Sequence, residues 1–461
     1  MKEDSDHNEV EEENVVRIAV IGCGWWAQGW HLPHLAAHSP HIIIAALVNS
    51  TPNPTSTLAS SPLLSLSELS IKYDCPCFHS VSEMLAEETV GSTLDGAIIA
   101  TSHASHYQVG ISLLQEGISR RQRHLEGGEN TAHRVINILM EKPMTTDVIE
   151  ARSIWEMSSN TYPEGAFIIN HTASYRPQTQ IARHIIASNE IGQIRHISAS
   201  MNGPLMWLFN DPSNHAWVST IPWQTASSPD DDENQHRPMI GNGYAYGQIA
   251  HVLAWIYAVL GAGEKKKDDI AIPTKVFCNM SYATNTGADV SFAAVITCHD
   301  GITFALSGTA LLPGSQYADP PVGKHINIEL FGEKGCLLYG GDDRLPESGR
   351  LEVRKTALGK KEDGQSVFPC APGRDWSDLL GDDVASELKD GFYFEDGKQE
   401  GYGPGSMKSF LDACRASSMQ YARGTHVQNA AVNDSLIGLR TVQVIDAMYR
   451  SSISGNVEEI G

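Results

Sequence analysis

The segment Val16–Ala27, VRIAVIGCGWWA, constrains the fold most strongly. An apolar, strand-like run ends at Gly22, and a helical pattern begins a few residues later. Glycines at this turn let backbone N–H groups and a helix N-terminus approach a pyrophosphate closely. The third position of the motif is Ala27, which this fingerprint permits. The segment therefore predicts a dinucleotide-binding βαβ unit, with these residues at the cofactor: Gly22, Gly24, Trp25 and Trp26.

Strand-like and helix-like stretches alternate from residue 15 to about residue 160, which is typical of a parallel sheet built from βαβ units. The expected strands are 16–21, 42–49, 76–79, 95–101 and 134–142, and the expected helices are 25–38, 64–73, 81–88, 104–116 and 146–158. Ser80 is expected to cap the third helix, with Glu83 completing a capping box. The basic, aperiodic stretch 118–132 is predicted to be a surface insertion.

The pattern changes beyond about residue 165, and a chain of 461 residues is expected to hold more than one domain. A strand at 166–170 and a helix at 178–188 precede alternating segments at 195–201, 275–283, 289–298, 302–310, 325–331 and 336–339. Such runs favour a mostly antiparallel sheet, closed by helices at 407–422 and 428–451. The loop 202–240, which holds Trp207, Trp217 and Trp223, is long enough to be functional or disordered.

The predicted fold is therefore α/β, with two domains. An N-terminal Rossmann domain would cover 15–160, and a C-terminal α/β domain with a large, open, mostly antiparallel sheet would cover 161–461. Residues 1–14 carry seven acidic side chains and are predicted to form a disordered tail. The net charge of −22 disfavours binding to nucleic acid or to an anionic membrane.

No run is apolar and long enough to span a membrane, and the N-terminus lacks the features of a secretory or transit signal. We therefore expect a cytoplasmic protein. Cys75 and Cys77 form the only close cysteine pair, and no histidine cluster accompanies them. Reduced structural thiols are expected there, and no metal site is predicted.

Polar residues follow two of the expected parallel strands at the edge where open α/β sheets bind ligands. The first group is Thr101, Ser102 and His106, which would face the nicotinamide, although Ser102 could simply cap the next helix. The second group is Glu141 and Lys142, directly before Pro143, which ends the strand. A lysine delivered to the edge beside a dinucleotide suggests redox chemistry.

Asn49 and Ser50 end the second strand, where NAD enzymes commonly place an acidic residue against the ribose 2′-hydroxyl. A neutral Asn49 removes the charge that would repel a 2′-phosphate, and this favours NADP over NAD. No basic residue follows before Lys72, so NAD stays open, as does an ordinary turn.

A glycine-led helix carries His251, which lies opposite the apolar stripe that begins at Ile249 and Val252. Small residues flank it on the same face, which leaves space for a ligand. Its ordinary pKa near 6.5 suits proton transfer close to neutral pH. A structural histidine is the alternative interpretation.

Together, Gly22-x-Gly24, Thr101–His106, Glu141-Lys142-Pro143 and the His251 helix resemble the Gfo/Idh/MocA family (glucose–fructose oxidoreductase and inositol dehydrogenase). The resemblance implies a Rossmann domain, an open-sheet domain that often mediates oligomerisation, NAD(P), and a sugar, cyclitol or related polyol. Lys142 would match the family's active-site lysine and His251 its catalytic histidine. The family often has aspartate four residues before that histidine, where this chain has Gly247.

The expected activity is hydride transfer between nicotinamide and a carbinol or carbonyl carbon of such a small-molecule substrate. His251 would move the hydroxyl proton and Lys142 would stabilise the developing alkoxide. The expected substrate-binding residues are Asn170, Arg176, Tyr246 and Gln248. A homo-oligomer, dimer or tetramer, is also expected. A non-catalytic NAD(P)-binding regulator, a hydrolase or lyase with a redox-neutral NAD cycle and, more distantly, a methyltransferase stay open.

Overall fold

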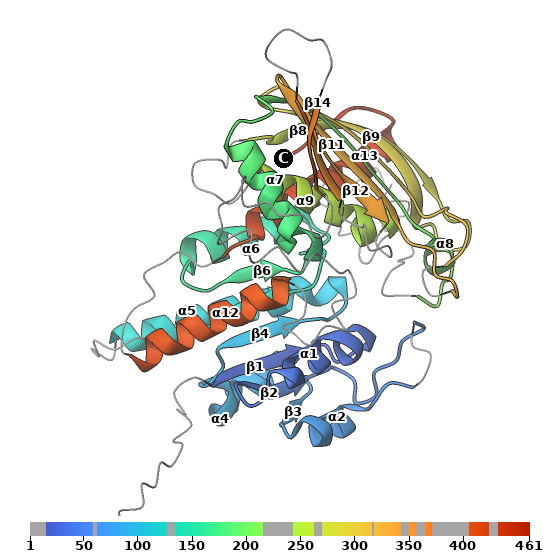
Figure 1. The fold of residues 1–461 in the computed structure, drawn as a ribbon. Coiled ribbons are helices and arrows are strands. Elements are labelled where there is room, and N and C mark those ends of the chain that lie inside the picture. Colours follow the sequence, from blue (N-terminus) through green and yellow to red (C-terminus); the bar gives the residue numbers. More distant parts are fainter. Residues whose placement is uncertain are drawn as a thin grey trace, which may run out of the picture.

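A computed structural model describes residues 15–58, 62–126, 134–214, 243–261, 270–315, 318–342, 350–355, 365–370, 405–423 and 432–461 (Figure 1). The predicted tail at 1–14 lies outside these residues, as do Trp217 and Trp223. No helix in the described ranges is both long enough and apolar enough to cross a bilayer.

The first part of the chain forms a six-stranded parallel sheet in the order β3-β2-β1-β4-β5-β6. Its strands are β1 (Val16–Ile21), β2 (Ile42–Val48), β3 (Cys77–Phe78), β4 (Gly96–Ile99), β5 (Asn137–Met140) and β6 (Phe167–Ile169). The strand order reverses between β1 and β4, and open α/β sheets bind ligands at such a switch point. The predicted Rossmann architecture is confirmed.

The connecting helices are the π-helical turn η2 (Ala27–His31) with α1 (Leu32–Ala37), then α2 (Leu66–Tyr73), α3 (Val81–Ala86), α4 (Glu88–Gly91), α5 (His106–Glu126) and α6 (Val148–Glu156) with η4 (Met157–Thr161). The Ser80 hydroxyl accepts the Glu83 N–H at 3.1 Å, as predicted. The capping box at this helix was wrong, because the Glu83 carboxylate accepts from His79 instead of Ser80. A complete capping box lies at Ser65 and Glu68.

The predicted insertion at 118–132 was wrong over its first part, because α5 continues to Glu126. A Cβ on Gly117 would meet the Tyr162 ring at 2.4 Å or a little more, so glycine is needed for this helix to pack closely. Arg120 is buried and donates to the Leu94 carbonyl at 2.9 Å. Both contacts stabilise the helical conformation of the basic stretch. They are tertiary contacts, so the sequence pattern did not predict this helix.

The second sheet has nine strands in the order β14-β13-β12-β11-β7-β10-β9-β8-β15. They are β7 (Ile194–Asn202), β8 (Pro273–Tyr282), β9 (Asp289–Cys298), β10 (Thr303–Thr309), β11 (His325–Gly332), β12 (Gly335–Asp342), β13 (Arg350–Lys355), β14 (Gln365–Cys370) and β15 (Glu458–Glu459). Only the β7–β10 pairing is parallel among these described strands, so the predicted mostly antiparallel sheet is confirmed.

The second half of the chain contains further helices, of which α9 contacts β7 and α13 contacts β8 of the second sheet. They are η5 (Thr172–Tyr175), α7 (Pro177–Ala187), α8 (Met206–Phe209), η7 (Ala245–Ile249), α9 (Ala250–Leu260), α12 (Gly405–Ala422) and α13 (Ser435–Ser454). The predicted loop 202–240 is thus partly helical at α8, where the Trp207 indole donates to the Pro204 carbonyl. Residues 215–240 of that loop lie outside the described part.

The late helix α12 returns to the first sheet, where it packs on β5, β1 and β6. Met407, Phe410 and Leu411 are buried in one core cluster with Val16 and Ile18 of β1. The predicted boundary at residue 160 precedes β6, which pairs in the parallel sheet. We propose that the first domain ends near residue 170 and that α12 belongs to it.

Candidate active site

The turn after β1 is built to leave backbone exposed at the sheet edge. Gly22 has φ +92°, and a Cβ there would meet the Ala100 backbone at 2.5 Å. Nothing lies within 4 Å of a Cβ placed on Gly24, so this side of the turn is open space. Asn49 holds the turn in place, since its Oδ1 accepts the Cys23 N–H at 3.0 Å. The open glycine turn at the helix start fits a pyrophosphate.

Aromatic rings cover the first turns of the helix that follows. Trp25 lies against Trp26 with ring centroids 5.9 Å apart, and Trp26 stacks on Trp30 at 5.3 Å. Trp26 is the more exposed of the pair at the turn, with 38% of its surface accessible. Both predicted cofactor residues therefore lie directly beside the glycine turn.

Glu141 joins three elements through one carboxylate oxygen. Its Oε1 accepts from Trp26 Nε1 at 2.7 Å, from His31 Nε2 at 2.9 Å and from Asn170 Nδ2 at 2.6 Å. Burial opposes ionisation of this side chain, but the hydrogen bonds from His31 and Asn170 outweigh it and lower the pKa of Glu141 to about 2. Glu141 is thus a fixed anion that ties the glycine-turn helix to the ends of β5 and β6.

Lys142 leaves the end of β5 and reaches the second domain. Its Nζ donates to the Gly247 carbonyl at 2.8 Å, inside the π-helical turn η7. Burial lowers the pKa of Lys142 to about 8, with Glu141 opposing and Lys324 adding to the shift. Position 247 therefore contributes a backbone oxygen to the lysine, where the resemblance implied an aspartate carboxylate.

His251 lies on the next turn, at the start of α9. Its ring meets the His171 ring edge-on, with centroids 5.6 Å apart. Burial lowers the pKa of His251 well below 6.5, and the nearby charge of Lys142 lowers it further. His251 is therefore neutral at physiological pH and able to accept a proton.

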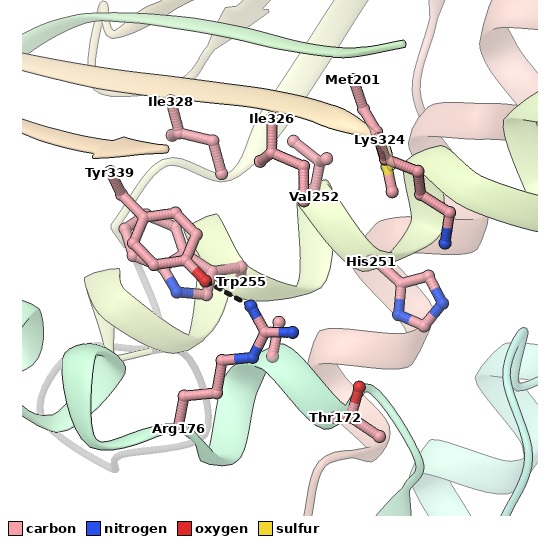
Figure 2. A pocket seen from close by; sticks show the side chains of 11 residues that line it. Thr172, Arg176, Met201, His251, Val252, Trp255, Lys324, Ile326, Ile328 and Tyr339 are labelled. Atoms are coloured by element: carbon pink, nitrogen blue, oxygen red, sulfur yellow. Dashed lines mark hydrogen bonds between the residues drawn. The ribbon is translucent and has the colours of Figure 1, made fainter. Parts of the chain in front are cut away.

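A cavity of about 450 Å³ opens beside His251, between α9 and the inner face of the second sheet (Figure 2). One wall is apolar and holds Met201, Val252, Ile326 and Ile328. Trp255 and Tyr339 stack at 4.3 Å to form the end of the cavity. Arg176, predicted to bind substrate, also lines the cavity, and its Nη1 donates to the Tyr339 hydroxyl at 2.7 Å.

Three predicted site residues are buried, and protein groups engage their polar atoms. Tyr246 is fully buried, stacks on Tyr449 and donates to the Thr146 carbonyl, so its ring lies in the core and away from the cavity. Asn170 is buried with both amide ends engaged, by Glu141 and by Ser406. His106 is buried between the Pro143 and Thr101 carbonyls and therefore positions those two loops.

The remaining predicted residues lie near the crevice. Thr101 and Ser102 follow β4 at the switch point, with the Thr101 hydroxyl donating to the Ser102 carbonyl. Ser50 is exposed beside Asn49, whose amide donates to the Thr51 carbonyl. Gln248 is buried next to the Lys142 contact, and its Oε1 has no hydrogen-bond partner among the described residues.

Three residues of the site were missed from the sequence. His171 directly follows Asn170 at the carboxyl edge, so the same edge rule that selected Asn170 could have found it. Lys324 precedes β11 and His31 lies in η2, and neither position carries a local signal. Among the described residues, no group of three or more His, Cys, Asp or Glu side chains could hold a metal ion.

Comparison with known proteins agrees with this geometry. Residues 16–120 match the Gfo/Idh/MocA family model, described as an oxidoreductase family with an NAD-binding Rossmann fold. The matched residues lie within the Rossmann domain and support the resemblance to this family. The resemblance predicted from the sequence is therefore confirmed. No curated protein matches the chain.

Solved structures of oxidoreductases share the fold of both domains of this protein. Levoglucosan dehydrogenase, in complex with NADH and levoglucosan, is 13% identical, with a TM-score of 0.60 over 96% of this chain and 99% of that chain. An oxidoreductase domain protein from Kribbella flavida is 17% identical, with a TM-score of 0.62 over 97% and 100%. The WlbA dehydrogenase from Bordetella pertussis, in complex with NADH and UDP-GlcNAcA, is 15% identical, with a TM-score of 0.60 over 97% and 98%.

Proposed function

We propose that this protein is an NAD(P)-dependent oxidoreductase that moves a hydride between nicotinamide and a carbinol or carbonyl carbon of a sugar, cyclitol or related polyol. The observation that carries the proposal is the meeting of Lys142 with the His251 segment, beside an open glycine turn and a cavity of about 450 Å³. Levoglucosan and UDP-GlcNAcA, named with the similar structures, are compounds of the sugar class.

The glycine turn fits a dinucleotide, because Gly24 leaves space at a helix start and Gly22 brings the strand ends close together. Gly22, Gly24, Trp25 and Trp26 would hold it, with Thr101 and Ser102 toward the nicotinamide. The bound nicotinamide supplies the hydride acceptor or donor. All remaining steps belong to the side chains of the chain itself.

In oxidation, neutral His251 accepts the proton of the substrate hydroxyl at a ring nitrogen, and in reduction it returns that proton. Protonated Lys142 stabilises the negative charge that develops on the same oxygen. Glu141, fixed by Trp26, His31 and Asn170, holds the end of β5 and therefore the backbone that carries Lys142. Gly247 orients the ammonium group through its carbonyl.

The test is nicotinamide absorbance with a panel of sugars, cyclitols and their keto forms, for the native protein and Lys142→Met. We expect turnover with at least one member and a loss of about 100-fold or more in kcat for the variant, as for removal of one transition-state donor. Lys334→Met, at an exposed position of the β11–β12 turn, is the matched control. Full turnover by Lys142→Met would contradict the assignment, and NADH binding without turnover would favour a regulator.

We propose a preference for NADP over NAD. Asn49 is neutral and engaged with the glycine turn, and the exposed Ser50 next to it offers a hydroxyl. The His79 Nδ1 lies 3.3 Å from the Asn49 carbonyl oxygen, so the imidazole ring stands beside this strand end. Titration with NADPH and NADH, followed by tryptophan fluorescence, tests the preference.

We further propose that the protein is a homo-oligomer. Phe277 and Val295 are cross-strand partners on β8 and β9 and are exposed by 39% and 55%. Exposed apolar side chains paired on one sheet face support an interface there. Light scattering should give a mass of two or four chains, and Val295→Glu should reduce it; a single-chain mass for the native protein would contradict this.

A further inference from the structure

The cavity beside His251 concentrates positive charge. Arg176 and Lys324 line it beside the neutral His251, and no Asp or Glu is among its described lining residues. The whole chain, by contrast, has a net charge of −22. A cluster of cationic side chains in the concave site of an acidic protein attracts an anionic ligand.

The cationic groups are held so that they face one space. Arg176 is 3% exposed, and its bond to the Tyr339 hydroxyl fixes one arm of the guanidinium. Figure 2 shows the other arm, the Lys324 ammonium and the His251 ring turned toward the same part of the cavity. A fixed guanidinium fork matches the paired oxygens of a carboxylate or phosphate.

The charged groups around His251 also favour an anionic ligand. After burial, the groups that lower its pKa are Lys142, His171, Lys324 and Arg176, which come from β5, the β6 end, the segment before β11 and the α7 start. His171 is buried, and neither ring nitrogen has a hydrogen-bond partner among the described residues. An anionic ligand would interact favourably with these positive charges.

We propose that the substrate is an anionic sugar whose carboxylate or phosphate binds Arg176 and Lys324 while its reacting hydroxyl lies at His251. The apolar wall of Met201, Val252, Ile326 and Ile328 would receive the C–H face of the ring. This inference rests on the proposed oxidoreductase function and names the substrate class of the same site.

The experiment compares matched ligands on the full-length protein with saturating NADPH, by calorimetry. The probes are D-glucose, D-glucuronate and D-glucose 6-phosphate, with the galactose series as a second set. We expect at least one anionic sugar to bind about tenfold or more tightly than its neutral parent, and the difference to shrink at high salt. The carboxylate and phosphate arms identify which anion the site takes.

Lys324→Met and Arg176→Gln should each remove most of the preference, whereas Lys275→Met, which removes an exposed lysine from the same sheet, should retain it. Equal affinity for neutral and anionic sugars in the native protein would overturn the inference. The inference would also be overturned if no anionic sugar bound. It would equally be overturned if Lys324→Met and Arg176→Gln both kept the preference for anionic sugars. If the anionic preference is absent but neutral sugars are turned over, the proposed oxidoreductase function still holds. If NADPH does not bind, both the proposed function and this inference are contradicted.

Discussion

At the residue scale, we expect the side chains at the strand ends to decide which dinucleotide binds. Asn49 is bonded to the Cys23 N–H and the Thr51 carbonyl, so it contributes no charge next to the ribose. Asn49→Asp would place a carboxylate where a 2′-phosphate is expected and repel it, while it accepts from a ribose 2′-hydroxyl. We predict that the NADPH-to-NADH affinity ratio falls about tenfold or more by fluorescence titration. An unchanged ratio would show that residue 49 does not face the ribose.

The protonation states of Lys142 and His251 predict the pH profile of alcohol oxidation. Burial lowers the pKa of Lys142 to about 8, and the reaction needs the protonated ammonium, so kcat/KM should fall as the pH rises through about 8. Burial and the charge of Lys142 lower the pKa of His251 well below 6.5, so the neutral base persists on the acid side and the acid limb should lie below pH 6.5. In Lys142→Met, the residual activity should lose the alkaline limb. A limb that persists there belongs to another group.

The strand-end residues show what sequence can and cannot reveal about a site. Lys142, His251 and Arg176 follow from edge position, Pro143 and helical spacing, and the structure brings them to one region. Tyr246 lies in a π-helical turn, whereas a sequence pattern assumes regular α-helical spacing, so the direction of its side chain could not be predicted. Lys324 enters from a segment whose position depends on long-range strand pairing, which carries no local signal.

At the scale of the element, the start of the His251 helix depends on a buried carboxylate. Asp289 of β9 is fully buried and accepts from the Ala245 N–H at 2.9 Å and from the Tyr449 hydroxyl. Gly243 has φ +44°, and a Cβ there would overlap the Asp289 carboxylate. The turn before η7 therefore requires glycine at 243 and an acceptor at 289.

We predict that Asp289→Ala lowers the free energy of unfolding by about 1–3 kcal/mol, because it leaves buried donors without an acceptor. Burial raises the pKa of Asp289 to about 6. The stability it contributes is therefore complete below the unfolded pKa near 4 and declines as the pH rises through about 6. Asp289→Asn should remove this part of the pH dependence in urea unfolding, whereas the exposed Asp412→Asn should not. The same slope in Asp289→Asn and the native protein would contradict the assignment.

The ends of helices and strands were predicted well where only one face of the element is buried. They were predicted poorly where tertiary contacts bury polar residues as well. Apolar and polar residues alternate along β9 and recur at helical spacing along α2. Both elements end within a few residues of their predicted ends. The helix α5 extends ten residues beyond its prediction, because Arg120 is buried by hydrogen bonds to carbonyls that only the folded chain supplies. Tertiary contacts of this kind override local propensity.

At the scale of the whole molecule, the two domains are tied by a helix from near the end of the chain. α12 packs on the parallel sheet, and a Cβ on Gly96 of β4 would meet Phe410 and Cys414 at 2.7 Å. The sequence of α12 carries no signal for which sheet this helix packs on. The predicted domain boundary at residue 160 therefore did not include α12 in the first domain. The core of the dinucleotide domain is therefore formed by N-terminal strands together with α12.

We predict that Phe410→Ala destabilises the protein by about 3–5 kcal/mol, as expected for a large buried aromatic side chain. Because Phe410 shares a core with β1, the variant should also bind NADPH more weakly near its unfolding midpoint. Tyr421→Ala, on the same helix but 41% exposed, is the control and should cost about 1 kcal/mol or less. Equal effects of the two changes in urea unfolding would show that α12 does not stabilise this core.

The most direct test of the central claim is a crystal structure of the protein with reduced dinucleotide and a bound sugar. The account predicts the pyrophosphate on the turn at Gly22 and Gly24, with nicotinamide C4 facing the cavity beside His251. The reacting carbon should lie about 3–3.5 Å from C4, with its oxygen within reach of Lys142 and His251. A dinucleotide bound elsewhere, or a nicotinamide turned away from Lys142, would contradict the account.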